Sequence, residues 1–356
     1  TIIPTDLNGK GAVDMIKQLP GTLTGALWTE SRELMAYGLE NWQTGQLYIN
    51  KKPTGALASA QFGDGYGDSH RGMHGAPTGS REFVVANANI TRKLGQYAKY
   101  DPSIKQTTHP LANILARLEN HPFAHRGMEN GKPIRNIDNT IRAAIEGGWS
   151  CLDQVDKYFS KPRAMLHEVE GEANWVESRP VGNLVLRITD KDSIENILPK
   201  VLAAAASPNP FTISFESMEK VTQLKWVLGG DFAIDMPNMK ATIEDNDRFV
   251  KNLTQENGVY QGDEKPHHLV YCAPSSVSES VQKAATNANL FIDKKKPVCD
   301  GFVDMIHHFR IQSTTVVTHH AGDNSYEELR RQRAFGTKKP SIEQSAQLLK
   351  NPDLIS

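Results

Sequence analysis

The chain has 356 residues, and its 40 Lys and Arg nearly balance its 41 Asp and Glu, which leaves a formal net charge of −1. This length is sufficient for two domains with separate apolar cores. The balanced charge gives no broad attraction for nucleic acid or an anionic membrane, so we expect neither partner. No apolar run approaches the roughly 18 residues of a membrane-spanning helix, and the first residues lack a starting Met and a signal sequence. We therefore expect no membrane span, and we expect that residue 1 follows a cut in a longer chain.

The cysteines lie far apart in the sequence and form no CxxC pair; they are Cys151, Cys272 and Cys299. This spacing indicates neither a disulfide framework nor a thiolate zinc site. It favours a reducing, cytoplasmic location.

The N-terminal region predicts a strand, a helix and a second strand. Residues 22–28, TLTGALW, predict a buried strand, a helical segment extends to about residue 41, and residues 46–49, QLYI, predict the next strand. Residues 61–80 contain six glycines among polar residues without periodicity, which predicts a long loop. Long glycine-rich loops in compact enzymes tend to belong to functional sites.

The segment 93–163 predicts a helical connector, because its apolar residues recur at helical spacing. One stripe contains Leu111, Ile114, Leu115 and Leu118, and a second contains Ile141, Ile145, Leu152, Val155 and Phe159.

Beyond residue 172 the predicted strands and helices alternate. Strands are expected at 184–188, 211–215, 268–272, 290–292 and 314–318, and helices at 194–205, 277–288 and 303–309. Such alternation predicts a mostly parallel sheet covered by helices. From residue 321 the composition is polar and charged, which predicts a surface helix or tail.

Three histidine pairs raise a metal-site hypothesis, with Glu216, Asp300 and Asp304 as further ligands; the pairs are His267–His268, His307–His308 and His319–His320. However, adjacent histidines on a strand point to opposite faces, and no HExxH or CxxC partner is present. We favour a structural role for these histidines and predict no metal ligand.

Two further patterns suggest chemistry but are outweighed by structural interpretations. Cys299 lies beside a turn, as a nucleophile can, but a buried or half-exposed structural thiol is the favoured interpretation, and we predict no catalytic residue. Residues 63–68, GDGYGD, approach a GxGxxG pattern, but the third glycine is misplaced and two acids stand where pyrophosphate would lie. We predict no cofactor-binding residue.

The most informative pattern is an ordered set: LTGA at 23–26, GQLYINKKPTGA at 45–56 and QFG at 61–63. It resembles the closing part of aldehyde dehydrogenases that oxidise glutamate γ-semialdehyde, where an LTGA strand leads to GNxYxNxxxTGAxxGxQPFGG. The chain departs from this pattern at Gln61, where the family has Pro, and at Asp64, which replaces a glycine. These departures affect the details of the substrate site.

The resemblance implies a substrate-binding role for Gly55, Ala56 and Phe62. Gly55 and Ala56 would hold the substrate α-carboxylate through backbone N–H groups, and Phe62 would pack against its aliphatic stem. A glycine lets the backbone approach an anion closely, and exposed N–H donors bind a carboxylate without a counter-charge. The alternative for Gly55 and Ala56 is a plain hairpin turn.

A second resemblance covers most of residues 165–320. EGEAN at 170–174, SRPVG at 178–182 and the stretch 293–298 are similar to the C-terminal domain of long proline utilization A enzymes, a degenerate aldehyde dehydrogenase nucleotide fold. The two resemblances imply an α/β chain in which the end of an aldehyde dehydrogenase catalytic domain precedes a degenerate Rossmann-like parallel-sheet domain. The expected segments are the catalytic-domain end at 1–92, the helical connector at 93–163, the C-terminal domain at 164–320 and the polar tail at 321–356.

In that family the nucleophilic cysteine, the general-base glutamate and the NAD-binding fold all precede the LTGA strand. The resemblance therefore implies part of an NAD-dependent dehydrogenase of proline catabolism that acts with a missing N-terminal region on a small-molecule substrate. It also implies a homo-oligomer, and FAD if a proline dehydrogenase domain precedes this region. The isolated chain is expected to be inactive. Two alternatives stay open: a noncatalytic oligomerisation or interaction scaffold with a degenerate dehydrogenase fold, and a histidine-based metal module.

Overall fold

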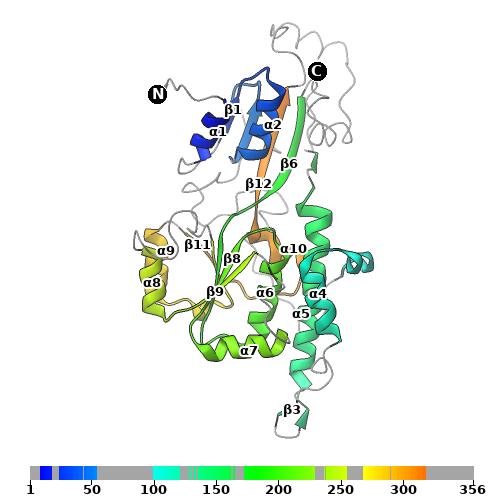
Figure 1. The fold of residues 1–356 in the computed structure, drawn as a ribbon, viewed down its shortest axis with the longest axis vertical. Coiled ribbons are helices and arrows are strands. Elements are labelled where there is room, and N and C mark those ends of the chain that lie inside the picture. Colours follow the sequence, from blue (N-terminus) through cyan, green and yellow to red (C-terminus); the bar gives the residue numbers. More distant parts are fainter. Residues whose placement is uncertain are drawn as a thin grey trace. The chain divides into compact units, whose positions relative to one another are not determined.

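The protein divides into two compact α/β units, which are described separately (Figure 1). The computed structural model describes residues 9–17, 24–42, 44–53, 99–120, 128–129, 132–133, 135–161, 163–164, 172–228, 236, 238–254, 268–288 and 290–317. The described residues of the first unit fall within 1–87, 160–179 and 310–356, and those of the second fall within 88–159 and 180–309. The expected domain boundaries near residues 92, 163 and 320 stay a prediction.

The first unit contains a five-stranded sheet with the order β1-β2-β12-β6-β5. Its strands are β1 Thr24–Leu27, β2 Gln46–Ile49, β5 Arg163–Ala164, β6 Glu172–Pro180 and β12 Phe309–Val317. Strands β1, β2 and β12 are parallel, whereas β5 and β6 are antiparallel. The parallel part is therefore assembled from the two ends of the described chain.

Two helices supply the apolar core of the first unit, α1 Gly9–Lys17 and α2 Arg32–Asn41. Ser31 begins α2 as its N-cap, and its side chain accepts a hydrogen bond from the Leu34 backbone N–H at 3.2 Å. The core joins these helices to one face of the sheet through Val13, Met35, Leu39, Trp42, Leu47, Ile49, Trp175 and Val316. Burial of this face stabilises the parallel strands.

The second unit contains a five-stranded, all-parallel sheet with the order β11-β10-β7-β8-β9. The strands are β7 Leu184–Ile188, β8 Phe211–Phe215, β9 Met239–Ile243, β10 His268–Tyr271 and β11 Phe291–Asp293. All five residues of the central strand β7 are buried, as a parallel strand covered on both faces requires.

Helices cover both faces of this sheet; Figure 1 shows α8 and α9 on one side and α5 and α6 on the other. The longer helices are α4 Pro110–Glu119, α5 Arg135–Gln154, α6 Ile194–Ala206, α7 Met218–Leu228, α8 Asn246–Thr254 and α9 Glu279–Asn287. Shorter elements are η2 Pro102–Gln106, a hairpin of β3 Met128–Glu129 and β4 Lys132–Pro133, the π-helical turn Val155–Phe159, η6 Pro274–Ser276, α10 Gly301–Met305 and η7 Ile306–His308. None of the helices in the described part of the chain has the length and apolar character of a membrane span.

The expected mixed α/β class with parallel strands is confirmed. The strands predicted at 46–49, 184–188 and 211–215 match β2, β7 and β8, and the stripe through Leu111 lies on α4. Strand β12 begins at Phe309, five residues before the predicted position. The first half of the strand was missed because it contains polar residues that the structure buries. The sequence did not predict the helices α1, α7 and α8, the strands β6 and β9, or the two-residue strands β3, β4 and β5.

Gly301 provides a test of the packing in the second unit. A Cβ atom built there would lie 2.1 Å from the backbone oxygen of Ser150 on α5, so one of two backbone segments would have to move. We expect Gly301→Ala to lower the free energy of unfolding by about 1–3 kcal/mol, as measured by urea denaturation.

Gly148→Ala is the matched control, because its Cβ would meet side-chain ends rather than backbone, with the end of Leu115 nearest at 2.7 Å. Alanine is also favoured over glycine in a helix interior by about 1 kcal/mol. Equal losses for the two variants would contradict the packing described here.

Candidate functional site: the carboxyl edge of the first sheet

The candidate site lies where strands β1 and β2 end. In the parallel register Leu27 pairs with Ile49, and Val316 of β12 pairs with Ile49 as well, so the three strands end at the same edge. Trp28 and Thr29 follow β1, and residues 50–53 follow β2. The carboxyl ends of parallel strands are where α/β proteins commonly bind ligands.

Asn50 turns the chain away from β2 at this edge. Its φ of 54° lies in the left-handed region, which Asn tolerates better than most residues. The Asn50 N–H donates to the Leu27 carbonyl at 2.8 Å, and the Thr29 N–H donates to the Asn50 side-chain oxygen, also at 2.8 Å. Asn50 therefore joins the ends of two neighbouring strands.

The same corner is connected to the start of α2. The Thr29 hydroxyl accepts a hydrogen bond from the Ser31 N–H at 3.0 Å, and Ser31 is the N-cap of that helix. The turn after β1 is thus held by the strand beside it and by the helix after it.

Residues 51–53 precede the predicted carboxylate anchor in the sequence. Lys51 is half-buried, whereas Lys52 and Pro53 are exposed. Trp28 at the end of β1 is 59% exposed, which is unusual for an indole. The edge therefore offers lysine side chains and an aromatic surface, groups suited to a small anionic ligand with an apolar stem.

The predicted substrate-binding residues Gly55, Ala56 and Phe62 lie outside the described residues. The glycine-rich segment 61–80 and the GDGYGD pattern lie outside them too. Their roles stay a prediction.

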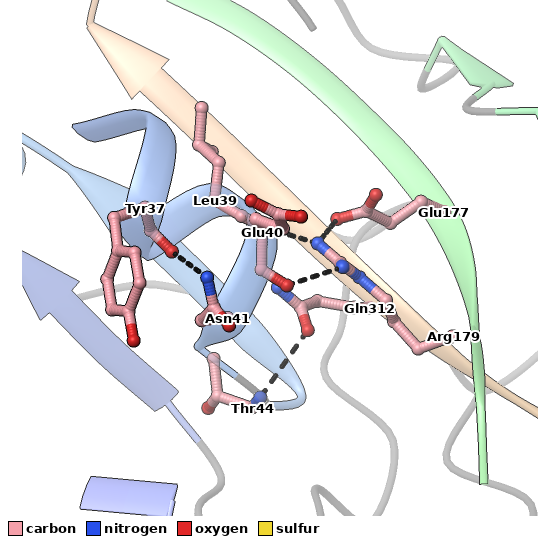
Figure 2. A network of polar contacts seen from close by, with 8 residues as sticks. All are labelled: Tyr37, Leu39, Glu40, Asn41, Thr44, Glu177, Arg179 and Gln312. Atoms are coloured by element: carbon pink, nitrogen blue, oxygen red, sulfur yellow. Dashed lines mark hydrogen bonds and ion pairs between the residues drawn. The ribbon is translucent and has the colours of Figure 1, made fainter. Parts of the chain in front are cut away.

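A polar network holds α2 against β6 and so positions β2 (Figure 2). The Arg179 guanidinium donates to the carbonyl oxygens of Leu39 and Glu40 in the last turn of α2, the second at 2.9 Å, and pairs with Glu177 at 2.8 Å. A cation at a helix C-terminus satisfies carbonyls that have no partner within the helix. Burial raises the pKa of Glu177, although Arg179 opposes this shift.

Strand β12 holds the other side of β2 through buried polar groups. Gln312 accepts from the Thr44 N–H at 3.5 Å, and the Ser313 N–H donates to the Gly45 carbonyl at 3.0 Å. The Thr315 hydroxyl accepts from the Gln46 amide at 3.4 Å and donates to Asn174 of β6 at 2.7 Å. Since Gln46 and Thr315 are almost fully buried, these bonds offset their desolvation.

The described histidines do not gather into a metal site. His268, His307 and His308 are buried, and the His268 ring nitrogen Nδ1 lies 3.0 Å from the His307 carbonyl oxygen. Among the residues that the structure describes, no group of three or more His, Cys, Asp and Glu side chains could hold a metal ion. His267, His319 and His320 lie outside those residues.

Asp300 and Asp304, the acids considered as metal ligands, serve the backbone before and within α10. Asp304 accepts from the N–H groups of Val298 and Asp300, both at 3.0 Å, and Asp300 accepts from Phe302 and Val303 as the N-cap of α10. Burial raises the pKa of Asp304 to about 6. Glu216 accepts from the Asp190 N–H at 2.8 Å, at the carboxyl edge of the second sheet.

A buried ion pair lies near Asp304. Lys200 of α6 and Asp293 of β11 are 2.6 Å apart and almost fully buried. Burial alone would lower the pKa of Lys200 and raise that of Asp293, but their mutual attraction reverses both shifts. Burial lowers the pKa of His308 to about 4, so this imidazole is neutral at pH 7.

The carboxyl edge of the second sheet does not fit a dinucleotide. Thr189 donates its N–H and hydroxyl groups to Asp192 at 2.7 and 2.9 Å, Ser276 donates to the same carboxylate, and the Asp190 N–H is used by Glu216. A pyrophosphate would need such donors and would be repelled by these carboxylates. The described residues of this edge therefore serve the architecture.

Comparisons with known proteins support the fold. Neither protein-family models nor curated protein sequences match the chain. Among solved structures, proline utilization A from Corynebacterium freiburgense is similar over 88% of this chain, with a TM-score of 0.52 and 14% sequence identity. This chain covers 24% of that protein's length.

Two other solved structures are similar over about half of the chain. Proline utilization A from Bradyrhizobium japonicum matches 55% of this chain and 20% of its own, with 17% identity and a TM-score of 0.39. Succinic semialdehyde dehydrogenase from Streptococcus pyogenes, in complex with NADP+, matches 54% and 41%, with 9% identity and a TM-score of 0.37.

The sequence analysis did not identify the residues that hold the candidate site together. Asn50 has a recognisable signal, since an Asn directly after a predicted strand is typical of a left-handed turn. Arg179 has none, because its partners are backbone carbonyls 139 and 140 residues away.

A series of substitutions at Asn50 separates its two contributions. Asn50→Gly keeps the left-handed backbone but loses the bond to Thr29, whereas Asn50→Ala loses the bond and adds left-handed strain of about 1–2 kcal/mol. We expect the free energy of unfolding to fall in the order Asn, Gly, Ala, as measured by urea denaturation. Asn50→Asp, which keeps the acceptor, is the control; an alanine variant as stable as the glycine variant would argue against the strained turn.

We expect the free energy of unfolding to depend on pH through the carboxyl group of Asp304. Its folded-state pKa of about 6 exceeds the ordinary 3.8, so its stabilising contribution is complete below pH 3.8 and is lost as the pH rises through 6. Relative to Asp304→Asn, the wild-type protein should lose up to about 3 kcal/mol of unfolding free energy across this window. Denaturant titrations at several pH values measure the unfolding free energy of both proteins. His308 is present in both, so its contribution cancels in the difference between them. A difference that does not depend on pH would refute the assignment.

Proposed function

We propose that this chain is the C-terminal part of an NAD-dependent dehydrogenase that oxidises glutamate γ-semialdehyde to glutamate in proline catabolism. In this proposal the first unit supplies the substrate carboxylate anchor and the second is a noncatalytic cap. The supporting observation is the corner at Asn50, where the strand containing LTGA and the strand leading to TGA lie side by side and end together.

The corner suits carboxylate binding for physical reasons. Asn50 fixes the direction in which residues 51–53 leave the sheet, and Lys51 and Lys52 bring positive charge to that segment. In the proposal, the N–H groups of Gly55 and Ala56 bind the α-carboxylate, and Phe62 covers the aliphatic stem. Backbone donors need no side-chain reorganisation to bind an anion.

The proposal assigns the chemistry to a missing N-terminal region. That region would provide the thiol nucleophile and bind NAD, which accepts the hydride, and FAD would belong to a proline dehydrogenase domain preceding it. None of the three cysteines is assigned this role, because all three lie in the second unit, and Cys151 and Cys272 are buried there. We further propose a cytoplasmic homo-oligomer.

A second candidate function is a noncatalytic oligomerisation or interaction scaffold. The observation that favours it is the carboxyl edge of the second sheet, where Asp192 and Glu216 occupy the donors that a ligand would need. A scaffold would require no substrate anchor, so substrate binding distinguishes the two candidates.

Substitution of Ala56 tests the anchor. Ala56→Pro removes one N–H donor, and a hydrogen bond to a charged group contributes roughly 1.5–3 kcal/mol. We expect about 10- to 100-fold weaker binding of glutamate to the intact chain, as measured by isothermal titration calorimetry. Ala56→Gly keeps the N–H and should bind as the wild type does, and Phe62→Ala should weaken binding without abolishing it.

Two outcomes would count against the dehydrogenase proposal. If the wild-type chain shows no saturable glutamate binding, the scaffold is favoured. If the isolated chain turns over glutamate γ-semialdehyde with NAD, the assignment of the chemistry to a missing region is wrong. The intact mass of the protein at its source would show directly whether a longer polypeptide contains this sequence.

A further inference from the structure

We propose that Cys151 and Cys299 form an oxidisable dithiol, which closes to a disulfide when the protein meets a peroxide. The inference concerns the second unit alone and does not depend on the proposed function. None of the three cysteines, Cys272 included, forms a disulfide in the structure.

The segment containing Cys299 packs closely against helix α5. A Cβ atom built at Gly147 would lie 3.0 Å from both the Cα and Cβ atoms of Cys299. Two residues later, a Cβ atom at Gly301 would lie 2.7 Å from the Cys151 backbone nitrogen, and the Gly301 N–H donates to the Ser150 hydroxyl at 3.0 Å. Residues 299–301 therefore lie along the helix turn from Gly147 to Cys151.

Helix geometry directs the Cys151 side chain toward Cys299. Residues 147 and 151 lie on the same helix face, about 6 Å apart along the axis. Every Cα–Cβ bond in an α-helix tilts toward the N-terminus, so a side chain covers the turn before its own Cα. The Cys151 thiol thus leans toward Gly147, which has no side chain and over which Cys299 lies.

The position of Cys299 is fixed from both sides. The N–H groups of its neighbours Val298 and Asp300 donate to the carboxylate of Asp304, each at 3.0 Å. Cys299 itself has a φ of 55°, a left-handed backbone conformation that residues other than Gly, Asn and Asp rarely adopt. The backbone of Cys299 is therefore held against α5.

The two thiols differ in exposure, which sets the order of the steps. Cys299 is half-buried, whereas Cys151 is almost fully buried. The Cys299 thiol is therefore the one that reacts first with an oxidant from solvent. Hydrogen peroxide oxidises the Cys299 thiol to a sulfenic acid and is reduced to water. The Cys151 sulfur then attacks the Cys299 sulfur, the S–S bond forms, and the sulfenic hydroxyl leaves as a second water with the Cys151 proton.

The test is thiol counting and disulfide mapping on the full chain after treatment with hydrogen peroxide. We expect the thiols titratable in denaturant to fall from three to one, and to return to three with dithiothreitol. Mass spectrometry of a nonreduced digest should find one peptide pair linking Cys151 and Cys299, lighter than the sum of the free peptides by two hydrogens.

Cysteine variants provide the controls. Cys272→Ser removes a cysteine that is equally buried but surrounded by Asp192, Lys200 and Asp293, and it should still lose two thiols to peroxide. Cys299→Ser should lose none to a disulfide, with Cys151→Ala as the reciprocal variant. If the buried substitution prevents folding, the wild-type peptide map still decides.

Three results would overturn the proposal: three thiols after peroxide, a mapped bond that includes Cys272 or joins two chains, or Cys299 oxidised to the sulfinic acid without linkage to Cys151.

Discussion

The parallel pairing of β2 with β12 is the interaction on which the first unit depends. It joins segments 268 residues apart at Thr44 and Gln312, and it inserts β12 between β2 and β6. On one face the pairing completes an apolar core through Val316, and on the other it buries Gln46 and Thr315, which hydrogen-bond to each other. A buried polar group that loses its partner is costly, so this pairing strongly specifies the register that brings β1, β2 and β12 to a common edge.

The second unit uses its ionisable side chains for architecture. The ion pair of Lys200 and Asp293 links α6 to β11, and Asp304 organises the backbone that precedes α10. Removing one partner of a buried pair would leave an uncompensated charge, which is strongly destabilising. The residue types that suggested a metal site or a nucleophile in the sequence are, among the described residues, largely explained by these structural roles. Cys151 and Cys299 are the pair for which the geometry also suggests chemistry.

The two units illustrate different relations between sequence motif and structure. In the first unit the ordered motif follows two adjacent strands, and Asn50 and Thr29 join the ends of these strands at one edge of the sheet. In the second unit, the donors of Thr189, Asp190 and Ser276 at the carboxyl edge already bond to neighbouring carboxylates. Fold similarity and site chemistry are therefore separate questions for this chain.

Most of the regular elements, and the order of the LTGA and TGA motifs, can be predicted from the amino-acid sequence alone. Periodicity identified β2, β7, β8, α4 and α6, because their apolar residues repeat at strand or helix spacing. It missed β9, an edge strand whose Lys240, Ala241 and Ile243 are exposed, and α7, whose Met218 and Trp226 are exposed. Only the tertiary structure decided that β12 lies beside β2, that Arg179 caps α2 and that Cys299 lies over Gly147. Periodicity reports which face of an element is buried, whereas these contacts depend on which distant segment buries it, and no local pattern in the sequence contains that information.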